Sequence, residues 1–406
     1  IVFSNNLLAV QIYDYQTEKF IDAINSKILD VNSYNKKVNF KIINDDFPNA
    51  FVTEDNTIYL SSGLLSYSPD YVALLGVLAH EIGHIEKHHV KKRVNEVNDL
   101  KNFSSYGNLA VVVGSMIMKQ PEIVNAVIVN QTAVNNLFIN FSQDQEIEAD
   151  FYAIETIKKL KLPTNPIKEL LLILENKSGN NLIDEELKKF STHPIFEKRY
   201  EIIDNNKNAD FYNFNKDYQR EFDFIQAKFM AYTDSGMITK LKNDQKIYYD
   251  SIQLSKLGNL LESLKKINFL ISKNKNDYFI EETKADILLS YGYNKEAIKF
   301  YRKVLEAEPN NNYVKYNIFV NLELNSTNHK FKEDFFLNNL NLLKYFPKNQ
   351  NVLIKYYNLA KMLKYNEWIL FFETLLFENK DIKEILNQLN KQTKDYNLKK
   401  IIKLYS

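Results

Sequence analysis

The pattern of apolar and polar residues changes character along the chain. Residues 1–35 follow the amphipathic periodicity of a helix, and Val38–Asp46 alternates as a β-strand does. Two shorter strands are predicted at Ala50–Thr53 and Thr57–Leu60, with turn residues between them. From about residue 240 the helical periodicity continues without interruption. The pattern therefore predicts a mainly α protein whose first half contains a small β-sheet.

A long helix is predicted soon after the sheet, over residues 69–98. Ser68 is a favourable N-cap, Pro69 suits the first helical position, and Asp70 suits the positive end of the helix dipole. Apolar residues recur at helical spacing within this segment, namely Leu74, Leu75, Leu78, Ile82 and Ile85. A further helix is predicted over residues 143–160. These two helices carry the residues on which a functional interpretation depends.

The second half of the chain contains an internal repeat. Gly292, Ala297, Tyr301 and Pro309 have the spacing of a tetratricopeptide repeat. Gly258 precedes Gly292 by 34 residues, which is the period of that repeat. Helix pairs of this kind cannot bury their apolar faces alone, so they stack into a solenoid. We therefore expect a tetratricopeptide-like helical domain, with a generic helical bundle as the alternative.

The composition narrows the classes of function. The chain has 52 basic and 51 acidic residues, a net charge of +1, so no global field would attract nucleic acid. Cysteine is absent, so any metal must be held by histidine and carboxylate side chains. The longest apolar stretch, Leu109–Met118, is about half the length of a transmembrane helix, and we expect no transmembrane segment. Two interpretations of residues 109–139 stay open: a buried helix pair, or a surface that touches a membrane or holds substrate.

Four of the six histidines lie within ten residues, in the segment LLGVLAHEIGHIEKHH. His80 and His84 are four residues apart, so on a helix they face one side and can bind one ion. Glu81 lies about 100° around the helix from His80, near enough to reach a metal-bound water without binding the metal. This His-Glu-x-x-His pattern predicts a hydrolytic zinc site, which needs a third protein ligand.

The second predicted helix offers carboxylates for that third position. Glu146 stands in the segment QEIEAD, and Asp150 follows one helical turn later on the same face. We expect Glu146 to bind the metal and Asp150 to accept the second N–H of a ligand histidine. Glu148 and Asp144 are expected to point elsewhere. The alternative for Glu146 is a solvated acidic helix start.

Four segments occur in an order that resembles one family of zinc metalloendopeptidases: NAFVTEDNTIYLSSGLL, LAHEIGHIEKHH, EIEAD and STHPIFEKR. This is the family of the CAAX prenyl proteases, the heat-shock protease HtpX and the periplasmic protease–chaperone BepA. The resemblance covers residues 1 to about 235. The BepA-like branch also carries a C-terminal tetratricopeptide domain and lacks the membrane spans of the other branches. The resemblance implies one Zn²⁺ per chain, with His80, His84 and Glu146 as its ligands. It also implies that Glu81 is the general base and that Asp150 supports a ligand.

Two further candidates come from the segment STHPIFEKR. The resemblance places His193 and Arg199 over the active site. It also implies that His193 can take the fourth zinc position and keep the enzyme latent. Arg199 is expected to hold a substrate carbonyl or the transition-state oxyanion, and a loop cap is the alternative role for His193. We expect His88 and His89 to cover the helix surface or to pack locally rather than to bind metal.

We therefore expect an α+β zincin-type catalytic domain over residues 1–235 and an α-solenoid over residues 236–406. The expected function is a periplasmic zinc endopeptidase that cuts unfolded or misassembled proteins. Substrate is expected to lie extended along an exposed strand within Ala50–Leu60. The helical repeats would recruit substrates or a partner complex. The alternative is a chaperone or binding scaffold that acts through the repeats and has a latent or structural zinc site.

Overall fold

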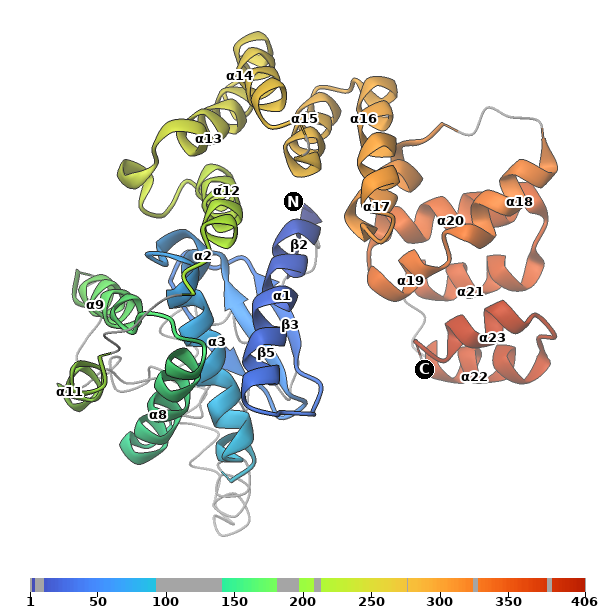
Figure 1. The fold of residues 1–406 in the computed structure, drawn as a ribbon. Helices are drawn as coiled ribbons and strands as arrows, with labels where there is room; N and C mark the ends of the chain where they lie inside the picture. Colours follow the sequence, from blue (N-terminus) through green and yellow to red (C-terminus); the bar gives the residue numbers. More distant parts are fainter. Residues whose placement is uncertain are drawn as a thin grey trace. The chain divides into compact units, whose positions relative to one another are not determined.

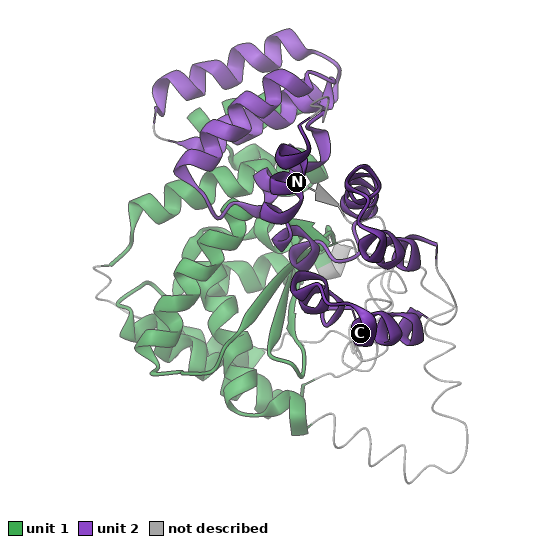
Figure 2. Cartoon of the chain, turned by 90° about the vertical axis from the view of Figure 1, so that its right-hand side faces the viewer, with its two compact units in different colours: residues 1–253 green, residues 254–406 purple. Residues whose placement is uncertain are grey.

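The structure is a computed structural model of the chain, and it describes residues 2–3, 11–92, 141–180, 197–207, 213–275, 277–323, 328–377 and 382–405. The chain divides into two compact units, residues 1–253 and 254–406, which are coloured separately in Figure 2. The boundary expected between residues 235 and 236 separates a catalytic domain from a helical-repeat domain. That division by function stays a prediction. Residues 109–139, with their two open interpretations, lie outside the described residues.

The mainly α fold class with a small sheet and helical repeats is confirmed (Figure 1). The sheet has the strand order β1-β2-β3-β5-β4. Strands β3 and β5 are parallel, and the other neighbours are antiparallel. The strands are β1 (Val2–Phe3), β2 (Gln11–Tyr13), β3 (Asn39–Ile43), β4 (Ala50–Val52) and β5 (Thr57–Ser61).

The helix predicted over residues 1–35 is wrong at its beginning. Helix α1 (Tyr15–Val31) begins only after the N-cap Asp14, whose side chain accepts a hydrogen bond from the Thr17 amide. The preceding residues form β2, because Gln11 and Ile12 pair with Ile43 and Ile42 of β3. This pairing is between residues far apart in the sequence, and local periodicity does not report it.

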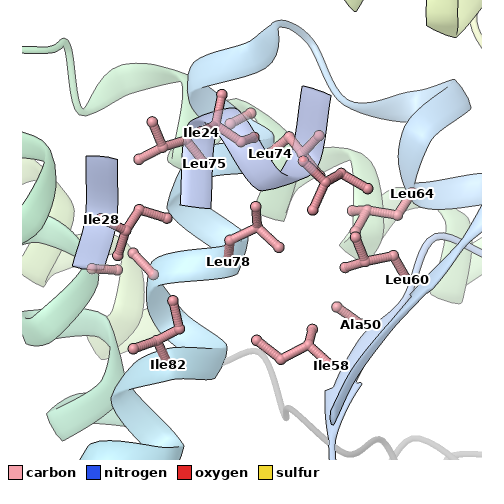
Figure 3. Close-up of a cluster of buried hydrophobic side chains, with 14 of the residues drawn as sticks. Ile24, Ile28, Ala50, Ile58, Leu60, Leu64, Leu74, Leu75, Leu78 and Ile82 are labelled. Carbon is pink, nitrogen blue, oxygen red and sulfur yellow. The ribbon is translucent and has the colours of Figure 1, made fainter. Parts of the chain in front are cut away.

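Figure 3 shows the part of the first unit's core that lies between the sheet, α1 and the two helices that follow the sheet. Helix α2 (Ser62–Tyr67) follows β5 and leads into α3 (Tyr71–Glu86). Apolar side chains from α1, α2, α3, β4 and β5 meet there: Ile24, Ile28, Ala50, Ile58, Leu60, Leu64, Leu74, Leu75, Leu78 and Ile82. Nearly every residue of α3 is buried, because other elements pack around it. The helix that carries the histidine motif is therefore held rigidly within the core.

Helix α3 is shorter than predicted at both ends. Asp70 is its N-cap and accepts a hydrogen bond from the Ala73 amide at 2.8 Å, whereas Ser68 ends α2 as the C-cap. The helix ends at Glu86, because His88 has a left-handed backbone with φ of 57° that interrupts the helix. A short helical turn resumes at residues 89–92, and residues 93–98 lie outside the described part of the chain.

The N-cap of α3 makes stability depend on pH. Burial raises the pKa of Asp70 to about 6, and the nearby carboxylates of Glu169 and Asp223 add to the rise. Since the folded pKa exceeds the unfolded value of about 3.9, stability falls as pH rises through this window. Asp70→Asn keeps the cap acceptor but has no charge to bury. We expect its free energy of unfolding, relative to that of wild type, to rise by ~1–2 kcal/mol as pH goes from 4.5 to 7.5.

The measurement is urea unfolding of both proteins at the two pH values, in the same metal state. The difference between the proteins is compared across pH, so that pH effects common to both cancel. A difference that stays constant from pH 4.5 to pH 7.5 would contradict the assignment to Asp70.

The described residues of the first unit contain five more helices: α8 (Gln143–Lys159), α9 (Asn165–Asn180), α11 (Glu197–Asn205), α12 (Lys216–Thr233) and α13 (Asn243–Lys256), whose last residues enter the second unit. The helix predicted over residues 143–160 is confirmed as α8. Gly83 lets α3 approach α8 closely, since a Cβ at this position would lie 3.2 Å from the Ala149 backbone. This close approach brings the histidine motif beside the acidic segment of α8.

The second unit is built of successive helices that pack against their neighbours. Gly258 and Gly292, one period apart, both have a left-handed backbone, with φ of 85° and 80°, where a helix ends. Helical repeats are thus confirmed, and their tetratricopeptide identity stays a prediction. The helices are α14 (Leu260–Lys273), α15 (Tyr278–Ser290), α16 (Asn294–Ala307), α17 (Asn312–Asn321), α18 (His329–Asn338), α19 (Asn341–Tyr345), α20 (Gln350–Leu363), α21 (Asn366–Leu376), α22 (Ile382–Gln392) and α23 (Tyr396–Ile402).

Among the residues that the structure describes, no helix has both the length and the apolar character needed to span a lipid bilayer.

Candidate metal centre

Helices α3 and α8 bring two histidines and one carboxylate together. The Nε2 atoms of His80 and His84 are 3.0 Å apart. Glu146 on α8 places one carboxylate oxygen 3.3 Å from His84 Nε2 and the other 3.5 Å from His80 Nε2. All three side chains are buried, and within the described residues they form the one group of three with metal-ligand geometry.

A second layer of charged side chains surrounds this cluster. The Asp150 carboxylate lies 2.9 Å from His80 Nδ1, the nitrogen that points away from the other cluster residues. Arg199 on α11 donates to both oxygens of Asp150, at 2.6 Å from Nε and 2.8 Å from Nη2. Its third nitrogen, Nη1, lies 3.0 Å from Glu146. Arg199 thus joins the two buried carboxylates of α8.

The charges of this network depend on one another. Burial lowers the pKa of His80, but its hydrogen bonds and ion pairs with Asp150 and Glu146 offset burial and raise the pKa. Burial alone would raise the pKa of Asp150, but the positive charge of Arg199 and the His80 contact lower it. Asp150 therefore stays ionised, as a hydrogen-bond acceptor for His80 must.

The cluster fits zinc in donor type and in spacing. Zinc in hydrolytic sites takes two imidazole nitrogens and one carboxylate oxygen, and keeps a fourth position open. Tetrahedral bonds of 2.0–2.1 Å place ligand atoms about 3.4 Å apart. The two imidazole nitrogens are 3.0 Å apart, one Glu146 oxygen is 3.3 Å from His84 Nε2, and the other is 3.5 Å from His80 Nε2, all near that distance. His80, His84 and Glu146 could therefore hold one metal ion, and their donor types suit zinc.

The structure places most of the predicted site residues in this region. Glu81 is buried on α3 next to His80, and its charge contributes to the electrostatic environment of Arg199. His193 lies outside the described residues. Arg199 is beside the cluster and bound by carboxylates, and its predicted role at the oxyanion stays a prediction.

His89 was expected to pack locally, but the partners that it finds were not predicted. His89 Nδ1 lies 3.0 Å from His84 Nδ1, and His89 Nε2 lies 3.1 Å from Glu148. The number of histidines in the motif segment was the one sequence feature that pointed to a further role for His89. A contact five residues along the chain, however, needs the helix break at His88.

The buried cluster has the composition of a metal site, and comparison with known families supports a metallopeptidase domain. Residues 16–207, a little under half of the chain, match the model of Peptidase family M48. The resemblance that the sequence motifs indicated is therefore confirmed.

The curated proteins to which this chain is similar share one functional name. A "Beta-barrel assembly-enhancing protease" from Yersinia pestis is 25% identical over 199 residues, and that from Escherichia coli K12 is 25% identical over 183 residues. A "Putative beta-barrel assembly-enhancing protease" from Vibrio cholerae is 26% identical over 203 residues. The matches cover 45–49% of this chain and 37–40% of the relatives' length.

Proposed function

We propose that the protein is a zinc-dependent endopeptidase. The observation that carries this proposal is the convergence of His80 Nε2, His84 Nε2 and the Glu146 carboxylate in one buried group. Glu81 stands next in sequence to one of these ligands, as the His-Glu-x-x-His pattern requires. A purely structural zinc site would have no need of that glutamate.

The proposed chemistry divides between the metal and the chain. When bound, zinc would polarise the scissile carbonyl and make water a stronger nucleophile at neutral pH. Glu81 would take the proton of the attacking water and pass it to the leaving amine. This step needs a carboxylate that is held in place, and burial in α3 restricts the motion of Glu81.

Asp150 and Arg199 would position the ligands rather than react. A carboxylate on His80 Nδ1 keeps the hydrogen on that nitrogen, so that Nε2 is free to bind metal. Arg199 fixes the orientation of Asp150 through two parallel hydrogen bonds. The same guanidinium contacts Glu146, which aligns the third ligand.

Strand β4 is the proposed place where substrate binds. Within Ala50–Leu60, β5 has strand neighbours on both sides, whereas β4 is the last strand in the sheet order. β4 also packs beside α3. An extended peptide added along β4 would be held by its backbone, which suits unfolded proteins of varied sequence.

The biological setting rests on the relatives. They are named as proteases that enhance β-barrel assembly, and we propose that this protein acts on unfolded or misassembled proteins in the same context. The expected periplasmic location is proposed on the same likeness. The helical repeats of residues 254–406 would recruit substrates or a partner complex.

Removal of the metal tests the proposed function. We expect a chelator to stop digestion of β-casein, an unfolded protein, while the circular dichroism spectrum stays close to that of the untreated protein. The fold should survive because the apolar core between the sheet, α1 and α3 does not depend on a metal. Added Zn²⁺ should restore digestion.

Three outcomes are informative. Digestion that continues after complete metal removal contradicts the proposal. Unfolding on chelation indicates a structural zinc. Zinc binding without digestion favours the chaperone or binding-scaffold alternative, which acts through the helical repeats.

A further inference from the structure

We propose that His89 and Glu148 position the zinc ligand His84 by fixing which of its ring nitrogens carries hydrogen. This inference rests on the proposed zinc site. His84 Nδ1 lies 3.0 Å from His89 Nδ1, and His89 Nε2 lies 3.1 Å from a carboxylate oxygen of Glu148. The three side chains therefore form a chain that leads from the buried cluster toward the surface of α8.

A single arrangement of hydrogens is compatible with metal binding. His84 presents Nε2 to His80 and Glu146, so that nitrogen must carry no hydrogen when it binds a metal. The hydrogen of a neutral His84 is then on Nδ1, and it is donated to His89 Nδ1. His89 must consequently carry its own hydrogen on Nε2, and it donates that hydrogen to Glu148, a carboxylate that only accepts.

The backbone is shaped to permit this contact. A helix that continued past Glu86 would place His89 five positions after His84, away from its face. His88, with its left-handed backbone, instead turns the chain, and the residues that follow form a new helical turn. The ring of His89 is buried as a result, with its centroid 5.1 Å from that of His84.

Packing restricts the His84 ring further. Phe141 stacks on it with a centroid distance of 3.8 Å and an interplanar angle of 20°. Stacking defines the plane of the ring, and the hydrogen bond to His89 defines its rotation within that plane. His80 has an equivalent arrangement, in which Asp150 is the partner of Nδ1. Each ligand histidine thus has its own orienting group.

Zinc affinity, measured by competition with a chromophoric chelator, tests the role of His89 without any activity assay. His89→Phe keeps a ring but removes the acceptor, and we expect it to weaken zinc binding roughly 10- to 100-fold. His89→Gln can accept from His84 and donate to Glu148, so we expect it to retain most of the affinity. Glu148→Gln should weaken binding less than His89→Phe does.

Glu155→Gln is the matched control, because Glu155 is an exposed glutamate on the same helix. It should bind zinc as wild type does. Melting of the metal-free proteins shows whether a variant has simply lost its packing.

Wild-type affinity in His89→Phe would overturn the inference and leave the proposed function standing. Equal losses in His89→Phe and His89→Gln, with equally lowered melting temperatures, would reduce His89 to a packing residue. A wild-type protein that binds no zinc would overturn the proposed function together with this inference.

Discussion

Glu81→Gln is expected to abolish peptide-bond cleavage while the protein keeps its metal and its fold. Glutamine has nearly the same shape as glutamate but cannot take a proton from water. Loss of a general base lowers the rate by roughly 10²–10⁴-fold. Because Glu81 is not one of the three clustered ligands, metal content should match that of wild type. The measurement is the rate of β-casein digestion, together with zinc content and thermal melting.

Glu86→Gln is the control for this experiment. Glu86 is the last residue of α3 and is exposed, so the same change of charge occurs on the same helix away from the cluster. It should digest casein at the wild-type rate. If Glu81→Gln also cuts at that rate, another group is the base, and the proposed mechanism is wrong.

The local parts of the fold could be predicted because short-range patterns determine them. Alternation located β3, and the turn residues between two short apolar runs located β4 and β5. The helix predicted over residues 143–160 is α8. The spacing of His80 and His84 already placed both imidazoles on one face. Glu146, a carboxylate on a separate helix, was predicted from the absence of cysteine and from its one-turn spacing to Asp150, and the resemblance supported it.

What could not be predicted depends on contacts between distant segments or on a single backbone angle. β2 forms because it pairs with β3, which lies on the other side of α1 in the sequence. The left-handed backbone of His88 ends α3 early. The sequence just after His84 lacks the glycine that most often marks such a helix end, so the break was not predicted. The link from His84 through His89 to Glu148 follows from that break.

A buried ion pair far from the histidine cluster in sequence leads to the second large prediction. Lys228 on α12 and Asp14, the N-cap of α1, are both about 2% exposed, and their charged atoms lie 2.6 Å apart. Lys228 also donates to Gln16 at 2.9 Å. Lys228→Met would leave the Asp14 charge buried without a counter-ion. We expect a loss of ~3–5 kcal/mol in the free energy of unfolding, measured by urea denaturation.

Lys240→Met provides the matched control, since Lys240 pairs with Glu169 at the surface. Both side chains of this pair are more than half exposed, so Lys240→Met should lose less than ~1 kcal/mol in the free energy of unfolding. A Lys228→Met loss as small as this would show that the buried pair contributes little.

The dependence on pH separates the charge of Asp14 from packing. Burial alone would raise the pKa of Asp14, but Lys228 and the Thr17 hydrogen bond lower it below the usual value. The stabilisation is therefore fully present above about pH 4, the unfolded pKa, and is lost as pH falls through the lower folded value. The deficit of Lys228→Met should accordingly shrink in acid, because its carboxylate can then be buried neutral. A deficit that is the same at pH 3 and pH 7 would mean that the lysine acts through its packed methylene chain.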